Sequence, residues 1–182
     1  MRTHKRSYSQ SHANRGKRFE NLIDGTNNQY RNNNFADVRK VPPPLTILEV
    51  NGNQVDAKLE KATWVDYSGI YKGQAIIFDA KETKQERFPL KNLTDEQYKL
   101  LHSWHYKGAK AFLLVCFWIK NKNEPEIYYL NFEQLEAAWI IGQSNGGAKS
   151  IPLQFFRDHC VRIKSGIYTV HYLEAVGVLC ND

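Results

Sequence analysis

Several features that mark particular classes of protein are scarce in this sequence of 182 residues. Its three cysteines, Cys116, Cys160 and Cys180, are an odd number without C-x-x-C spacing, which argues against a disulfide framework and a zinc site. The longest apolar run, at 111–119, has the length of a buried strand and falls well short of the roughly 20 residues that span a membrane. The N-terminus lacks the apolar core of a signal peptide. We therefore expect a cytoplasmic protein without a membrane partner.

Excess positive charge is missing from most of the chain and lies at one end. Residues 1–40 contain nine Lys or Arg and three acids, whereas the remaining residues contain sixteen of each. A basic segment beside a neutral body is typical of a protein that binds a polyanion, such as nucleic acid or anionic lipid, although a solvated tail is the alternative. Residues 1–14 are polar, basic and nearly free of aliphatic side chains, so we expect a disordered basic arm there.

Hydrophobic periodicity and turn signals in the rest of the chain predict a mixture of helices and strands. A first helix is expected from Gly16, because Phe19, Leu22 and Ile23 recur at helical spacing. The later elements are expected in this order: a hairpin at 45–60 turning at Asn51-Gly52, a hairpin at 64–81, a helix from Thr94 to about Gly108, strands at 110–119 and 126–131, a helix at 132–141, a short helix within 150–159, and strand-like segments at 161–163 and 167–173. This order predicts an α/β fold with a mixed central β-sheet flanked by helices, in one domain over 15–182, with the hairpin at 45–60 projecting from it.

The hairpin at 64–81 carries charged residues where apolar or neutral ones are usual. If residues 72–73 form a two-residue turn, Asp66 pairs with Asp79, and their Cβ atoms lie roughly 5 Å apart on one face of the sheet. Lys81, two residues beyond Asp79, lies on the same face. A bulge at Gly69 is the alternative that would shift this register by one residue.

Two opposed carboxylates destabilise a hairpin unless another group compensates their charge. Lys81 can neutralise one of them. Asp66 and Asp79 together can also hold a divalent cation such as Mg²⁺, with water and phosphate at its other positions. Such a cation activates water and polarises a phosphoryl oxygen, and Lys81 would stabilise charge that develops on the phosphate. A surface salt-bridge cluster is compatible with the same pattern.

The spacing from Asp66 to the sequence Asp79-Ala80-Lys81 matches the acid and D/E-x-K motif of restriction-endonuclease-like nucleases. The surrounding sequence is more specific. Over residues 14–165 the chain resembles the RecU family of Holliday junction resolvases, in segments that follow the family's order: RGKRFENLI (15–23), VDYSGIYKGQAIIFDAKETK (65–84), FPLKNL (88–93) and KSIPLQFF (149–156). The last 17 residues show no such resemblance.

This resemblance implies a restriction-endonuclease-like fold and a homodimer that cuts four-way junction DNA symmetrically in recombination and repair. It implies dependence on Mg²⁺, for which Mn²⁺ can substitute, and other recombination proteins as partners. The hairpin at 45–60 would be a stalk that enters the centre of the junction. By the same resemblance Asp66 and Asp79 are metal ligands, Lys81 is the transition-state stabiliser, Gln97 is a further metal contact, and Glu20 is catalytic.

Some of these residues also have plain structural interpretations. Gln97 can complete a capping box with Thr94 at the start of a helix. Glu20 can be an exposed helix carboxylate paired with Lys17. The family usually has Glu where Asp79 stands and Thr where Trp64 stands, so Trp64 is expected to pack against DNA or a dimer partner.

Five cations are expected to bind the DNA backbone. Arg15, Lys17 and Arg18 lie at the start of the first helix, where positive charge opposes the helix dipole and a bound phosphate would compensate. Lys84 and Arg87 follow the strand that carries Lys81.

Three other functions remain compatible with the sequence. They are a junction- or DNA-binding protein that does not cleave, a nuclease of the same fold that acts on flaps or duplex, and a protein-interaction module whose basic arm is only a tail.

Overall fold

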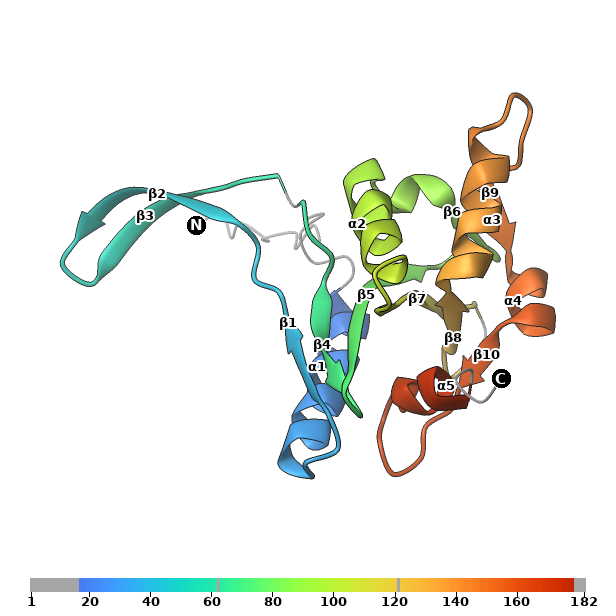
Figure 1. The fold of residues 1–182 in the computed structure, drawn as a ribbon, viewed down its shortest axis with the longest axis horizontal. Helices are drawn as coiled ribbons and strands as arrows, with labels where there is room; N and C mark the ends of the chain where they lie inside the picture. The colour runs from blue at the N-terminus through green and yellow to red at the C-terminus, as the bar shows by residue number, and fades with distance from the viewer. Residues whose placement is uncertain (1–16, 62, 121, 179–182) are drawn as a thin grey trace, which may run out of the picture.

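The computed structural model describes residues 17–61, 63–120 and 122–178 (Figure 1). Its elements in chain order are α1 (Lys17–Asn32), β1 (Asp37–Lys40), β2 (Leu45–Asn51), β3 (Gln54–Leu59), β4 (Tyr67–Tyr71), β5 (Gln74–Thr83), β6 (Arg87–Pro89), the 3₁₀ helix η2 (Leu90–Asn92), α2 (Asp95–His105), β7 (Lys110–Phe117), β8 (Glu126–Asn131), α3 (Phe132–Gln143), β9 (Ser150–Pro152), α4 (Leu153–His159), β10 (Val161–Ile163) and α5 (Tyr172–Val178). The expected basic arm at 1–14 lies outside the described residues. Within the described part, no helix is long and apolar enough to cross a membrane.

Six strands form the main sheet, in the order β1-β4-β5-β7-β8-β10. The pair β5/β7 is parallel and the other neighbouring strands are antiparallel, so the sheet is mixed. Strands β2 and β3 form one separate two-stranded sheet, and β6 and β9 form another. The predicted α/β class with a mixed central sheet is therefore confirmed.

Helices cover both faces of this sheet. Helices α1 and α5 contribute to the hydrophobic core on one face, and α2, α3 and α4 contribute to the core on the other. Successive residues of β7 alternate between the two cores, with Phe112 and Leu114 in the first and Leu113 and Val115 in the second. A strand buried on both faces reads as a continuous apolar run, which explains the sequence at 111–119.

The hairpin β4–β5 has the register that its turn residues predict. Lys72 and Gly73 both have positive φ, 49° and 76°, as a type I′ turn requires. The pairing runs without a shift from the turn to Tyr67 opposite Phe78, so the bulge considered at Gly69 does not form. Asp79 and Lys81 consequently share one face of β5, and Phe78 projects into the core on the other face.

The hairpin β2–β3 extends away from the main sheet (Figure 1). All residues of both strands are exposed. Its turn lies at Gly52-Asn53, one residue later than expected, because Asn51 is still paired with Gln54. The ends of the hairpin stay close, since the Glu60 amide donates to the Pro44 carbonyl over 2.9 Å.

The C-terminal region differs from the prediction. Residues 161–163 form a strand as expected, but the strand-like segment expected at 167–173 is wrong, because bends and a turn occupy 166–170 and helix α5 begins at Tyr172. Tyr172, Leu173 and Val176 are buried in the core beside α1, at the spacing of one helix face. The β-favouring residues around Tyr172 suggested a strand, and burial against the sheet overrides that local preference.

Candidate functional site

The carboxylates of Asp66 and Asp79 meet where the β4–β5 ladder ends. The last paired residues are Tyr67 and Phe78, so Asp66 lies one residue before β4. Its amide donates to Asp79 Oδ1 over 3.1 Å, and its own Oδ2 accepts from the Ala80 amide over 2.9 Å. Each aspartate therefore bonds the backbone of the opposite strand, and these bonds hold the two carboxylates side by side.

Asp79 is fully buried and is bonded on several sides. Its Oδ2 pairs with the Lys81 ammonium, and its Oδ1 accepts from Gln97 Nε2 over 2.9 Å. Lys81 also donates to Gln97 Oε1 over 3.3 Å, and its side chain retains 17% exposure. The structure thus brings Asp66, Asp79, Lys81 and Gln97 together, with the lysine reaching the surface.

Gln97 forms the capping box considered for it and also contacts Asp79. Thr94 and Gln97 form a capping box at the start of α2, because the Gln97 amide donates to Thr94 Oγ1 and Gln97 Oε1 accepts from the Thr94 amide, each over 3.2 Å. The side-chain nitrogen of Gln97 remains free for Asp79. The helix cap therefore orients the amide that contacts the carboxylate pair.

The electrostatics of the pair leave negative charge incompletely compensated. Burial, followed by the charge of Asp79, raises the pKa of Asp66 to about 7, against a smaller opposing effect from Lys81. A single lysine does not offset two adjoining carboxylates. Oxygen-rich, negatively charged groups of this kind suit Mg²⁺ or Mn²⁺, so Asp66 and Asp79 fit such a cation. Among the described residues, however, no three His, Cys, Asp or Glu side chains are grouped closely enough to hold a metal on their own.

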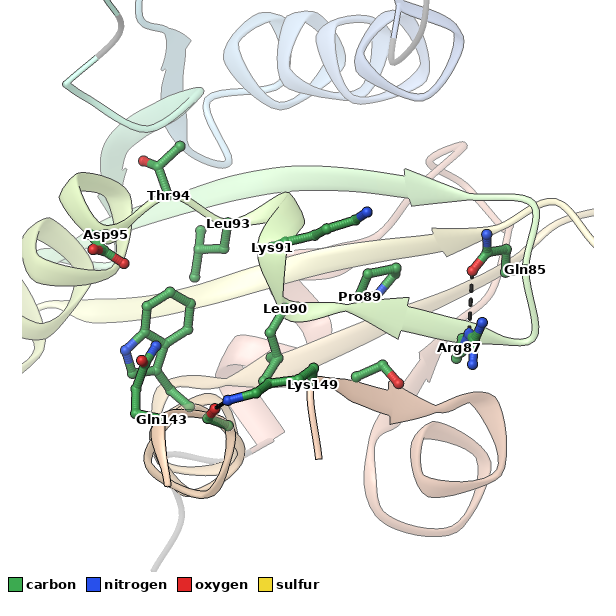
Figure 2. A pocket seen from close by; sticks show the side chains of 13 residues that line it. Gln85, Arg87, Pro89, Leu90, Lys91, Leu93, Thr94, Asp95, Gln143 and Lys149 are labelled. Carbon is green, nitrogen blue, oxygen red and sulfur yellow. Dashed lines mark hydrogen bonds between the residues drawn. The ribbon is translucent and has the colours of Figure 1, made fainter. Parts of the chain in front are cut away.

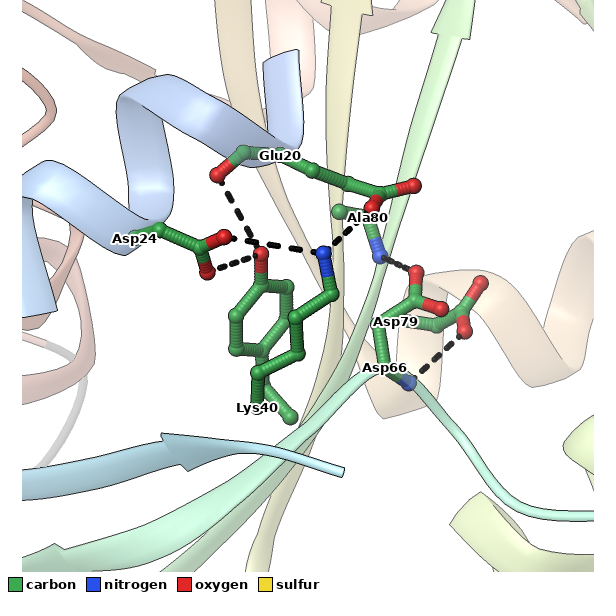
Figure 3. A network of polar contacts seen from close by, with 7 residues as sticks. Glu20, Asp24, Lys40, Asp66, Asp79 and Ala80 are labelled. Atoms are coloured by element: carbon green, nitrogen blue, oxygen red, sulfur yellow. Dashed lines mark hydrogen bonds and ion pairs between the residues drawn. The ribbon is translucent and has the colours of Figure 1, made fainter. Parts of the chain in front are cut away.

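Glu20 lies on α1 and belongs to a second polar network, shown in Figure 3. Its Oε2 pairs with Lys40 Nζ at 2.6 Å. The pairing of Glu20 with Lys17 that the sequence suggested is therefore wrong. Lys40 also lies 3.5 Å from Asp24 Oδ2, and Asp24 Oδ1 accepts from the hydroxyl of Tyr67 over 2.8 Å. Sequence reasoning missed Lys40 and Asp24, because their contacts join α1 to β1 and no local pattern predicts that packing.

The cations expected to bind DNA have different surroundings. Lys17, Lys84 and Arg87 are exposed. Arg18 stacks on Trp118, with its guanidinium carbon 3.9 Å from the ring centroid. Arg15 lies outside the described residues.

Arg87 also lines a cavity of about 740 Å³ beside the start of α2. Figure 2 shows Lys91 and Lys149 around the same cavity, together with Thr94, which caps α2. Lys91 lies in FPLKNL and Lys149 in KSIPLQFF, two of the segments that carry the family resemblance. The sequence could therefore have indicated both lysines, although it was not used to do so. The cavity therefore has two further cations, Lys91 and Lys149, among the residues that line it with Arg87.

Trp64 and two histidines of α2 have partners within the chain. Trp64 packs edge-on against Trp104 within the chain, at 5.8 Å between ring centroids, and is 38% exposed. His102 and His105 lie near Glu136 and Glu133, at 3.7 and 3.5 Å. Cys116 is a free, buried core residue.

Comparison with known sequences identifies a family and close relatives. The family model RecU, described as recombination protein U, matches residues 14–177. Holliday junction resolvase RecU of Lactococcus lactis subsp. lactis is 36% identical over 175 residues, which cover 92% of this chain and 79% of that protein. Holliday junction resolvase RecU of Streptococcus pneumoniae serotype 19F is 32% identical over 178 residues, which cover 93% and 86%.

The family match extends further than the sequence alone suggested. The resemblance was expected to end at residue 165, and this boundary is wrong, because the match continues to residue 177 and includes most of α5. Among solved structures, the chain is similar to Archaeoglobus fulgidus Hjc, a Holliday junction resolvase from an archaeal hyperthermophile, with a TM-score of 0.47, 10% identity and coverage of 81% and 95%. A likeness at this level supports no conclusion about function.

Proposed function

Because the chain belongs to the RecU family, we propose that it is a Holliday junction resolvase, an endonuclease that cuts four-way DNA junctions in recombination and repair. Two relatives at 36% and 32% identity carry that name. The structural observation that supports the proposal is the contact between Asp66 and Asp79, with Lys81 on the same face of β5. These residues supply the groups that phosphodiester hydrolysis needs.

Asp66 and Asp79 would hold Mg²⁺, or Mn²⁺ in its place, with Gln97 and Glu20 as supporting residues. When bound, such a cation polarises the phosphodiester and lowers the pKa of a coordinated water. The contribution of the chain is to fix both carboxylates before substrate arrives. The backbone amides of Asp66 and Ala80 and the side chain of Gln97 perform this task.

Lys81 would stabilise the negative charge that develops on the scissile phosphate. Its ammonium is already held by Asp79 and Gln97, so little side-chain entropy is lost when the phosphate arrives. Its partial exposure allows that approach. A preorganised cation of this kind acts chiefly on the transition state, so its loss should reduce cleavage more than binding.

Substrate binding would involve charge and shape outside the carboxylate site. The exposed cations Lys17, Lys84 and Arg87 would contact backbone phosphates, and we expect the same of Arg15 and Arg18. The projecting hairpin β2–β3 would enter the centre of the junction. A two-fold homodimer would present two sites for paired, symmetric nicks. The protein would act in the cytoplasm, with other recombination proteins.

The decisive experiment is cleavage of a mobile four-way junction with Mg²⁺, comparing wild type, Lys81→Ala and Lys122→Ala. Lys122, on the connection between β7 and β8, is the matched control, because it likewise pairs with a buried carboxylate, that of Glu126. We expect Lys81→Ala to lose cleavage by about 100-fold or more while retaining junction binding, and Lys122→Ala to cleave normally.

The same experiment separates the alternatives. Junction binding by the wild type without Mg²⁺-dependent cutting would identify a non-cleaving DNA-binding protein. Preferential cutting of a flap or a linear duplex would identify a nuclease with another substrate. Binding that does not weaken as salt increases would indicate that phosphate contacts are absent and would favour a protein-interaction module.

A further inference from the structure

One ammonium, that of Lys40, pairs with two carboxylates of α1. Its Nζ lies 2.6 Å from Glu20 Oε2 and 3.5 Å from Asp24 Oδ2. The two acids are one helical turn apart, so both side chains reach the same point beside the helix. The catalytic role proposed for Glu20 does not require Lys40, and the proposed mechanism does not use this lysine.

The backbone places this network next to the carboxylate pair. Lys40 is the register partner of Tyr67, which directly follows Asp66. The Tyr67 side chain is fully buried, and its hydroxyl contacts both Asp24 Oδ1 and the Glu20 carbonyl. Tyr67 therefore fixes α1 against β4. Figure 3 shows the Glu20 side chain extending from α1 toward Asp66.

The charges of the two networks do not balance. Four carboxylates, those of Glu20, Asp24, Asp66 and Asp79, face two ammonium groups, those of Lys40 and Lys81. The Lys40 side chain is 42% exposed, whereas that of Lys81 is 17% exposed. A phosphate of the DNA backbone can therefore reach Lys40 from solvent, and an exposed ion pair is weak enough to exchange.

We propose that Lys40 is an exchangeable counter-ion of Glu20 that couples the binding of DNA to the binding of a divalent cation. In the free protein Lys40 neutralises Glu20 and repels a cation near Asp66 and Asp79. A backbone phosphate of bound DNA draws the Lys40 ammonium to itself, and the Glu20 carboxylate then adds its charge to the cation site. This inference rests on the proposed function. It adds that the Glu20 charge becomes available to the cation site only when DNA is bound.

The first test measures Mn²⁺ binding to the free protein by calorimetry, with no DNA present. We expect Lys40→Met to bind Mn²⁺ about fivefold more tightly than wild type, because the competing charge is gone. Adding Glu20→Gln to Lys40→Met should remove this gain. Arg39→Met is the matched control, because Arg39 is the neighbouring cation of β1, projects to the opposite face and pairs with Asp37 instead.

The second test measures the coupling itself through junction affinity. A fluorescent four-way junction is titrated with protein at several Mg²⁺ concentrations and constant ionic strength, in a Lys81→Ala background that prevents cleavage. Coupling is reciprocal, so the factor by which Mg²⁺ tightens DNA binding equals the factor by which DNA tightens Mg²⁺ binding. We expect this factor to fall about fivefold with Lys40→Met and to stay unchanged with Arg39→Met.

Equal Mn²⁺ affinity in wild type and Lys40→Met, or an equal coupling factor, would overturn the inference. So would the same change with Arg39→Met, because that result would reflect net charge alone. If the wild type cleaves junctions with Mg²⁺ and either result is obtained, the counter-ion role fails and the proposed function stands. If the wild type neither cleaves junctions nor binds Mn²⁺, both fail.

Discussion

Gln97 connects the start of α2 to the carboxylate pair. Its amide oxygen accepts from the Thr94 amide, and its amide nitrogen donates to Asp79. The capping box was predictable from four consecutive residues, because Thr followed three positions later by Gln has a local geometric meaning. The contact with Asp79 was not predictable from that pattern, since it depends on how α2 packs over β5.

Substitutions separate the two roles of Gln97. Thr94→Ala removes the cap and should lower the free energy of unfolding by about 1 kcal/mol, with cleavage retained. Gln97→Leu also removes a donor from the buried Asp79, so cleavage should fall by about tenfold or more. Denaturant unfolding and junction cleavage below the unfolding transition check both. Equal cleavage by the two variants would contradict a role of Gln97 in the site.

Glu126 provides a pH-dependent contribution to stability. It is 1% exposed and is bonded by Arg157, Lys122 and Tyr128. Hydrogen bonds from Arg157, against the opposing effect of burial, hold the pKa of Glu126 well below its ordinary value of 4.5. A carboxylate with a lowered folded-state pKa stabilises the fold fully above its unfolded-state pKa, and this contribution is lost as the pH falls toward the folded-state pKa.

We therefore expect Glu126→Gln to lower the free energy of unfolding by about 1–3 kcal/mol at pH 7. The difference from wild type should shrink as the pH falls below about 4.5, because the wild type then loses its own contribution. Urea unfolding at pH 7 and at about pH 3 measures both differences. A difference that stays constant between these two pH values would rule out the charged form of Glu126 as the cause.

At the scale of elements, the turn residues of a hairpin made the pairing of its strands predictable from the sequence. Residues 72–73 fixed the β4–β5 register, and this register gave the meeting of Asp66 and Asp79 directly. Strand β1 was not predicted, because four residues with one buried side chain carry no periodic signal. The Lys40 network was missed for the same reason, since β1 carries that lysine.

The pairing of β1 depends on the absence of a side chain at Gly69. A Cβ there would lie 2.2 Å from the Asp37 carbonyl oxygen and 2.6 Å from Val38 Cα, and both are backbone atoms that cannot move aside easily. We expect Gly69→Ala to lower the free energy of unfolding by about 3 kcal/mol, as measured in urea. Gly25→Ala is the control, because Gly25 lies inside α1 with nothing within 4 Å and should stabilise by about 0.5–1 kcal/mol. A neutral Gly69→Ala would contradict the close approach of β1.

Removal of the hairpin β2–β3 should leave the stability of the main sheet unchanged. All of its strand residues are exposed, and Pro44 and Glu60 lie within hydrogen-bonding distance at its base. Replacing residues 45–59 with a short Gly-Ser connection should leave the melting temperature nearly unchanged. The variant should bind four-way junctions and linear duplex with similar affinity in a competition assay, because the part that enters the junction is gone. Retained junction preference would exclude a stalk function.

At the scale of the whole molecule, the order of elements was more predictable than their packing. Alternation of apolar and polar runs gave the mixed α/β sheet, since each run had a length and period typical of its class. The strand-like segment expected at 167–173 overlapped the start of α5, and the helix was not predicted, because its seven residues give a short pattern that becomes clear only against α1. Long-range packing therefore decided those parts of the fold where the local signal was short.

The proposed homodimer makes a prediction that no single subunit can test. A four-way junction has two-fold symmetry, and a two-fold dimer would place one carboxylate site at each of two opposed strands. A mixed dimer of wild type and Lys81→Ala, isolated through two different affinity tags, should therefore cut only one strand. On a supercoiled plasmid with an extruded cruciform, wild type should yield linear DNA, and the mixed dimer should yield nicked circles. Linear DNA from the mixed dimer, at a rate near that of the wild type, would mean that one site makes both cuts, and the symmetric arrangement would then be wrong.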